Sequence, residues 1–196
     1  MNKLKIGLIL PSLAYKGPIL IAQSIVNELS ADVNFDVYHF DNIKETEFKA
    51  KTIKIDFKQK IDFQKYDIIH THMLRPDLYV FLRSILGQCK SVKKISTIHQ
   101  FIDHDLKNQH PLIKATIASS LWHLAFRKFD ALVTLNEMMY TEYKERLPNL
   151  HVVKIHNGLN EMQDDFSILK TDIERITKFK KNYICLGTAA QLTKNK

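Results

Sequence analysis

Short, nearly continuous apolar runs recur along this chain, and each one ends at a polar or turn-forming residue. The first run is Lys3 to Leu10, which stops at Pro11, and similar runs occupy 66–70, 93–98 and 131–134. Such runs are typical of strands buried on both faces of a parallel sheet. Because segments with helical spacing lie between them, the sequence predicts an α/β fold, a Rossmann-like and mostly parallel sheet with helices on both faces.

Prolines mark the starts of three predicted helices, since a proline at the first helical position loses no hydrogen bond. The predicted helices cover residues 18–30, 76–86, 111–128 and 138–147, and the further strands 33–40, 51–57, 151–155 and 183–187. A polar, charged stretch lies between Glu161 and Lys181.

Composition sets the broad class of protein. The 196 residues are 45% hydrophobic and 26% charged, which allows a real core and excludes a disordered chain. No apolar run is long enough for a membrane span, and the first run is too short for a signal peptide. Cys89 and Cys185 form neither a disulfide framework nor a CxxC metal site. We therefore expect a cytoplasmic protein.

The net charge is +8, and only five of the 29 basic residues are arginine. Base readers and phosphate forks depend on arginine, so a lysine-rich surface gives a diffuse positive field instead. That field suits an anionic membrane surface or anionic substrates, or it serves solubility alone, and these interpretations stay open. A nucleic-acid partner is not expected, because the lysines are scattered without an aromatic-basic repeat.

Polar residues gather where predicted strands end, and sites in parallel sheets form outside the carboxyl ends of strands. The loop Lys16-Gly17-Pro18 lies between a strand and a helix, where a backbone can approach an anionic ligand, or it is a plain turn. The GxGxxG fingerprint and the GxxxxGK[ST] loop are both absent from the sequence. A nicotinamide dehydrogenase and a P-loop ATPase are therefore disfavoured.

Histidines form a second candidate site. His70 and His72 alternate along a strand end and share one face. With His99, Asp103 and His104 they could hold a metal ion, although the spacing matches no recognisable ligand set, and buried hydrogen-bonded histidines would fit equally. His99 follows a strand as either a cleft histidine or a surface one.

The predicted helix 111–128 carries many apolar residues, flanked by Lys114, Arg127 and Lys128. It is either core packing against the sheet or an interfacial helix that lies on lipid headgroups.

Six stretches in order give the chain its resemblance to a known family. They are Lys5 to Leu10 with the Gly17 loop, Tyr66 to His72, Ser96 to His99, Phe129 to Asn136, Val153 to Gly158, and Ile184 to Lys196. Together they resemble the N-terminal part of a family 4 glycosyltransferase of the two-domain GT-B type.

The resemblance implies two Rossmann-like domains, of which the first binds the acceptor and the second most of a nucleotide-sugar donor. It implies sugar transfer with retention of configuration, with no metal and no cofactor beyond the donor. Many such enzymes build capsule, lipopolysaccharide or glycolipid at the cytoplasmic membrane face. The expected organisation is an acceptor-side domain at 1–165, a linker at 166–181, and the start of a truncated donor domain at 182–196.

On the acceptor side, the resemblance implies roles for individual residues. Gly17 matches the glycine loop after the first strand, where many members have paired glycines and this chain has Lys16-Gly17-Pro18. His99 matches the strand-end histidine of the catalytic cleft. We expect Lys16, His72 and Arg75 to line the same cleft.

For the donor phosphates, Lys196 matches a lysine that contacts the pyrophosphate, and Gln191 stands where the motif usually has arginine. The downstream glutamate motif is not present, so we expect the isolated chain to have little transferase activity. Two alternatives stay open. One is a non-enzymatic binding module of the same fold, and the other is a metal-dependent hydrolase that uses His70, His72 and His104.

Overall fold

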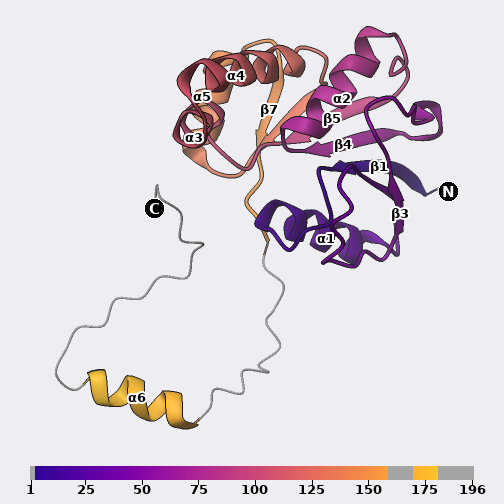
Figure 1. Ribbon diagram of the computed structural model, residues 1–196. Coiled ribbons are helices and arrows are strands. Elements are labelled where there is room, and N and C mark those ends of the chain that lie inside the picture. The colour runs from indigo at the N-terminus through magenta and orange to yellow at the C-terminus, as the bar shows by residue number, and fades with distance from the viewer. Residues whose placement is uncertain (1–2, 159–169, 181–196) are drawn as a thin grey trace. The chain divides into compact units, whose positions relative to one another are not determined.

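The computed structural model describes residues 3–158 and 170–180, and the chain divides into two units after Gly158. In the first unit, seven strands form one sheet in which every pair is parallel, in the order β3-β2-β1-β4-β5-β6-β7 (Figure 1). The strands are β1 (Leu4–Leu10), β2 (Val33–His39), β3 (Lys51–Lys54), β4 (Ile68–His72), β5 (Lys93–Thr97), β6 (Ala131–Thr134) and β7 (His151–Lys154). The predicted Rossmann-like sheet is confirmed.

Helices cover both faces of the sheet, as the sequence predicts. They are α1 (Gly17–Leu29), α2 (Leu74–Ile85), α3 (Ile102–Gln109), α4 (Leu112–Phe126) and α5 (Glu137–Arg146), with a short 3-10 turn at Phe63–Lys65. On one face, α1 packs Ile19 and Val26 against Leu8 and Val37. On the other face, α2 and α4 lie across the sheet from α1 (Figure 1), and Trp122 and Tyr79 belong to the larger core there.

The strand order changes direction between β1 and β4, because the chain first moves outward through β2 and β3 and then returns. In sheets of this kind the ligand site lies at this switch point, outside the carboxyl ends of the strands. Leu10 pairs with His39 of β2, and Ile9 pairs with Thr71 of β4. His39 and His72 therefore end the strands on either side of β1 at about the same level.

Two aspartates hold the opposite, amino-terminal edge of the sheet together. Asp67 accepts the Lys5 N–H on its side chain at 2.8 Å and donates its own N–H to the Lys5 carbonyl at 2.9 Å. Asp130 does the same with Lys94, at 2.8 Å for both bonds. Each aspartate thus satisfies the backbone groups where two parallel strands begin.

Several element boundaries differ from the sequence prediction. Helix α3 is not predicted, since only Ile102 and Leu106 of its residues are apolar and buried. Helix α2 begins at Leu74, two residues before Pro76, because Met73 turns the chain into the helix directly after β4. Helix α6 (Lys170–Lys180) occupies much of the predicted linker, and the predicted strand 183–187 lies outside the described residues.

Candidate functional site

The carboxyl edge of the sheet brings most of the predicted site residues together. Strand β1 leads through a loop to Gly17, β4 ends at His72, and β5 ends two residues before His99. Since β4 is the only strand between β1 and β5, Gly17 and His99 lie on the same edge of the molecule. The segments that follow these three strands therefore meet at one edge of the sheet.

Three of the histidines are in direct contact there. The His72 Nδ1 lies 2.8 Å from the His99 Nε2, and the two rings are stacked with centroids 5.0 Å apart. The His70 ring lies 4.6 Å from the His72 ring and hydrogen-bonds through Nε2 to the Thr97 hydroxyl at 2.8 Å. The contact between His72 and His99 follows from the register of β4 and β5. His72 pairs with Thr97, the last residue of β5, and His99 follows Thr97 by two residues.

Burial keeps these imidazoles neutral. It lowers the pKa of His99 to about 4. Burial, with a smaller contribution from His99, lowers the pKa of His70 to about 4. Burial, followed by the neighbouring His70 and His99, holds the pKa of His72 well below its usual value. At neutral pH each ring therefore carries one N–H donor and one acceptor nitrogen.

The contacts of His72 determine which nitrogen His99 offers to a ligand. His72 is fully buried, and its Nε2 has no hydrogen-bond partner. An orphaned buried N–H is rarer than an orphaned acceptor, so the proton belongs on the His72 Nδ1, which donates to the His99 Nε2. His99 then carries its own proton on Nδ1. Since His99 is only partly buried, this N–H is available to donate to an oxygen of a bound molecule.

Sequence reasoning missed His39, which ends β2. The His39 Nδ1–H donates to the Asp41 carbonyl at 2.9 Å, so Nε2 carries a lone pair. That nitrogen is buried without a partner, like the His72 Nε2. The sequence feature that could have indicated His39 is its position as a polar residue at the end of a predicted strand, between Tyr38 and Phe40.

Arg75, which we expected to line a cleft, lies in the first turn of α2. Its guanidinium pairs with Asp41 at 2.6 Å, and both side chains are well exposed. It also lies over the Phe40 ring at 5.9 Å. The pair links the segment after β2 to the start of α2 across the end of β1. An exposed pair contributes little stability, so Arg75 can exchange Asp41 for an anionic ligand at small cost.

Met73 joins β4 to α2 in a conformation that side chains rarely adopt. Its φ is 77° and its ψ 164°, a region populated almost entirely by glycine. Such strain is of order 1–3 kcal/mol and gathers at functional sites. Here it lies directly beside His72 and two residues before Arg75.

A buried carboxylate supports this edge from the sheet's other face. Asp77 accepts hydrogen bonds from the Thr71 hydroxyl at 2.5 Å and from the Trp122 indole N–H at 2.6 Å. Burial raises the pKa of Asp77 to about 7, although these hydrogen bonds oppose the rise. Asp77 therefore ties β4, α2 and α4 together beneath the histidines.

Lys16 and Gly17 are both exposed at the start of α1. A Cβ added to Gly17 would meet no atom within 4 Å, so the described neighbours do not require a glycine there. The open space around it is compatible with a molecule approaching the backbone. Its predicted role in binding stays a prediction.

His104 does not join the other histidines. It lies on α3 with its side chain largely exposed, next to Asp105 and Asn108. Asp103 instead pairs with Arg146 and Ser119. Within residues 3–158 and 170–180, no group of three His, Cys, Asp or Glu side chains has a metal-binding arrangement. The ligand set of the hydrolase alternative is therefore not assembled there.

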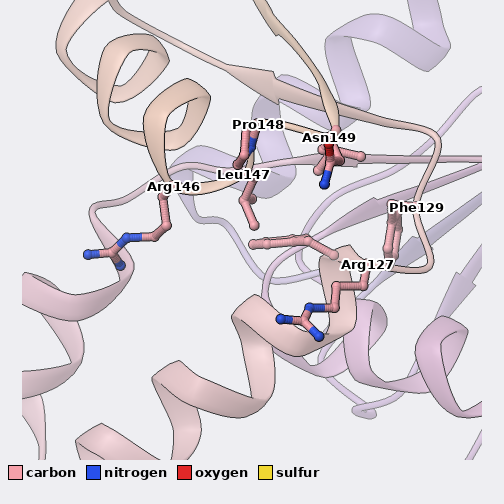
Figure 2. Close-up of a pocket in the computed structure, with 8 residues that line it drawn as sticks. Arg127, Phe129, Arg146, Leu147, Pro148 and Asn149 are labelled. Atoms are coloured by element: carbon pink, nitrogen blue, oxygen red, sulfur yellow. The ribbon is translucent and has the colours of Figure 1, made fainter.

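The two residues predicted to bind donor phosphate, Gln191 and Lys196, lie outside the described residues. A pocket of about 640 Å³ lies far from the histidines, at the amino-terminal edge of the sheet. Figure 2 shows Arg127 and Phe129 from the end of α4 beside Arg146, Leu147 and Pro148 from the end of α5. No predicted site residue lines it.

Known proteins resemble this chain over nearly its whole length. Residues 19–162 match the family described as Glycosyltransferase Family 4. Two curated relatives, both named O-antigen biosynthesis glycosyltransferase WclY and both from Escherichia coli, are each 29% identical over 203 aligned positions. The alignments cover 98% of this chain and 55% of each relative. The chain thus spans about half the length of the curated relatives it matches.

Proposed function

The chain belongs to Glycosyltransferase Family 4, and we propose that it forms the acceptor-side wall of a transferase. The reaction would move a sugar, with retention of configuration, from a nucleotide-sugar donor to a cell-surface glycan or glycolipid. Its relatives' names, which specify O-antigen biosynthesis, support an acceptor of this class. A lipid-linked acceptor would place the protein in the cytoplasm, at the inner face of the membrane.

The neutral His72–His99 pair is the observation that carries the proposal. A neutral imidazole with its tautomer fixed by a buried neighbour presents one N–H in a defined direction. At the carboxyl edge of the sheet, the His99 Nδ1–H would donate to an acceptor hydroxyl or to a donor oxygen, and it would do so without carrying charge. Lys16, Gly17 and Arg75 lie at the same edge as candidate contacts for the phosphates.

Chemistry at such a site needs a second wall. Stabilising a departing nucleoside diphosphate requires donors on both sides of the leaving group. We therefore propose that the 196-residue chain alone binds acceptor but turns over little donor. Gln191 and Lys196 would contribute to the phosphate side. No metal and no cofactor other than the donor enters this scheme.

The test compares His99→Ala with the matched control His104→Ala, an exposed histidine five residues away. Both are made in the protein that carries this chain, and transfer is followed with a panel of nucleotide-sugars and lipid-linked acceptors. We expect His99→Ala to lower kcat/KM about 100-fold and His104→Ala to leave it unchanged.

Three results would contradict the proposal: equal kcat/KM for the two variants, an inverted anomeric configuration in the product, or no turnover of any nucleotide-sugar by the unaltered protein. Ordinary turnover by the 196-residue chain alone would contradict the two-wall requirement.

A further inference from the structure

The outward side of helix α4 is unusually apolar for a surface helix. Its inner side is buried through Ala115, Trp122 and Phe126. The exposed fractions on its outer side are 67% for Leu112, 76% for Ile113, 56% for Ile117, 44% for Leu121 and 41% for Leu124. Residues 113, 117, 121 and 124 follow helical spacing, so they form one stripe along the helix. We call these five residues the α4 stripe.

The surroundings of the α4 stripe are positively charged. Between Leu106 and Phe129 the sequence has four lysines and arginines and no acidic residue. Lys114 lies near one end of the stripe, and Arg127 and Lys128 lie at the other, all exposed. On the adjacent helix α3, Asp103 is already engaged by Arg146. The stripe is therefore an apolar strip with cations at both ends.

We propose that the α4 stripe docks onto an anionic lipid bilayer, an inference that rests on the membrane-linked acceptor of the proposed function. Apolar side chains that enter the headgroup boundary, with lysine and arginine at its rim, are the pattern of a helix that lies in the membrane plane. The helix is about 22 Å long, enough to lie along a bilayer surface. In the described part of the chain, no helix is long and apolar enough to cross one.

The orientation of α4 relates this surface to the candidate site. The chain leaves β5 at the carboxyl edge, passes His99 and α3, and runs back along α4 to begin β6 at the amino edge. The end of α4 that carries Leu112 and Ile113 therefore lies on the side of the sheet where His99 is found. A bilayer along the α4 stripe would present a lipid-linked acceptor beside that edge.

The experiment measures binding of the protein to vesicles of phosphatidylcholine alone and of phosphatidylcholine mixed with phosphatidylglycerol. The stripe variant is Ile113→Gln/Ile117→Gln/Leu124→Gln. Its matched control is Leu29→Gln/Ile43→Gln/Met138→Gln, three residues with exposed fractions of 43%, 45% and 74% on other elements. We expect binding to the anionic vesicles to fall about tenfold or more in the stripe variant and to stay unchanged in the control.

A charge variant separates attraction from apolar insertion. In this variant Lys114, Arg127 and Lys128 are replaced by glutamine, and we expect vesicle binding to weaken about fivefold for each cation replaced. The control Lys58→Gln/Lys60→Gln, at two other exposed lysines, should leave binding unchanged. Circular dichroism confirms that each variant is folded.

The proposal is overturned if the stripe variant binds like the unaltered protein. It is also overturned if both vesicle types bind equally, or if the stripe mediates self-association without vesicle binding. Transfer to a detergent-dispersed acceptor keeps this test separate from the proposed function. The stripe variant should transfer sugar to the dispersed acceptor as fast as the unaltered protein does. If the unaltered protein itself shows no such transfer, the result contradicts the proposed function and not the docking of the α4 stripe.

Discussion

Both edges of the sheet carry polar side chains, but the hydrogen bonding of these side chains differs between the two edges. At the amino edge, Asp67 and Asp130 each accept one backbone N–H and return one, so the polar groups that meet there are paired. At the carboxyl edge, the Nε2 atoms of His39 and His72 are buried without a partner, and Met73 holds a strained backbone. The strand-end aspartates are therefore paired within the fold, and the strand-end histidines are paired only in part.

This difference separates stability from function within one sheet. An unpartnered buried polar atom costs about 1–3 kcal/mol, and such groups call for an explanation in a native structure. At the amino edge Asp67 and Asp130 pair with the strand backbone, whereas at the carboxyl edge two histidine nitrogens that end neighbouring strands have no protein partner. The carboxyl edge is the edge at which parallel sheets bind ligands. We therefore expect the aspartates to contribute to stability and the histidines to contribute to the proposed site.

Removing an aspartate from the amino edge should have the largest effect on stability. We expect Asp130→Ala and Asp67→Ala each to lower the free energy of unfolding by about 2 kcal/mol, since each leaves a strand N–H without its charged acceptor. Urea denaturation measures the change. Asp62→Ala is the control, because this exposed aspartate caps no backbone group of the 3-10 turn that follows it.

Transfer activity per folded molecule should be unchanged in both aspartate variants. A loss of kcat/KM comparable to that of His99→Ala, with stability intact, would break the division of roles between the two edges.

Acid should destabilise the carboxyl edge first. The folded pKa values of His70 and His99 are lowered to about 4 from 6.5, so the unfolded chain binds more protons between these values. The stability that neutral histidines contribute is thus present above pH 6.5 and is lost as the pH falls towards 4. Asp77 acts in the opposite sense, because its raised pKa favours proton uptake by the folded state.

Since the buried histidines outnumber Asp77, we expect the free energy of unfolding to fall over this range. Replacing His99 with asparagine should reduce the slope of the free energy of unfolding against pH by up to about 1.4 kcal/mol per pH unit. His104→Asn should leave this slope unchanged. Denaturant midpoints measured at several pH values give the slope. At the amino edge the pKa of Asp130 is lowered by Lys94 despite burial, so its contribution is lost only below pH 3.8. An unchanged slope in His99→Asn would contradict the burial of a neutral ring.

The sequence predicted the sheet well because burial on both faces leaves a visible trace. The runs that form β1, β4, β5 and β6 can be recognised by their apolar residues without knowledge of the helices that cover them. Helix α3 was missed because it buries little more than Ile102 and Leu106, so its pattern carries only one turn of signal. One aspartate of its first turn, Asp103, is instead a candidate metal ligand in the sequence analysis.

The site was predicted less completely, for a different physical reason. The HxH spacing showed that His70 and His72 share a face, but the contact of His72 with His99 depends on the β4–β5 register. Register is a property of strand pairing and cannot be read from either strand alone. His39 was missed for the same reason, because its neighbours across β1 are distant in sequence.

The smallest expected effect tests the strain at Met73. Glycine adopts the observed φ of 77° without a Cβ clash, so Met73→Gly should relieve strain of order 1–3 kcal/mol. It also gives up the methionine side chain and adds unfolded-state entropy. The expected net result is a gain of about 1 kcal/mol in the free energy of unfolding, measured by urea denaturation. Met138→Gly, in the first turn of α5, is the control and should lose stability instead.

If the strain at Met73 positions His72 for the site, the stabilised variant should transfer sugar more slowly than the unaltered protein. A variant that gains stability and keeps full kcat/KM would show that the strain has no part in the reaction. In that case the carboxyl edge would differ from the amino edge only in its unpartnered histidines.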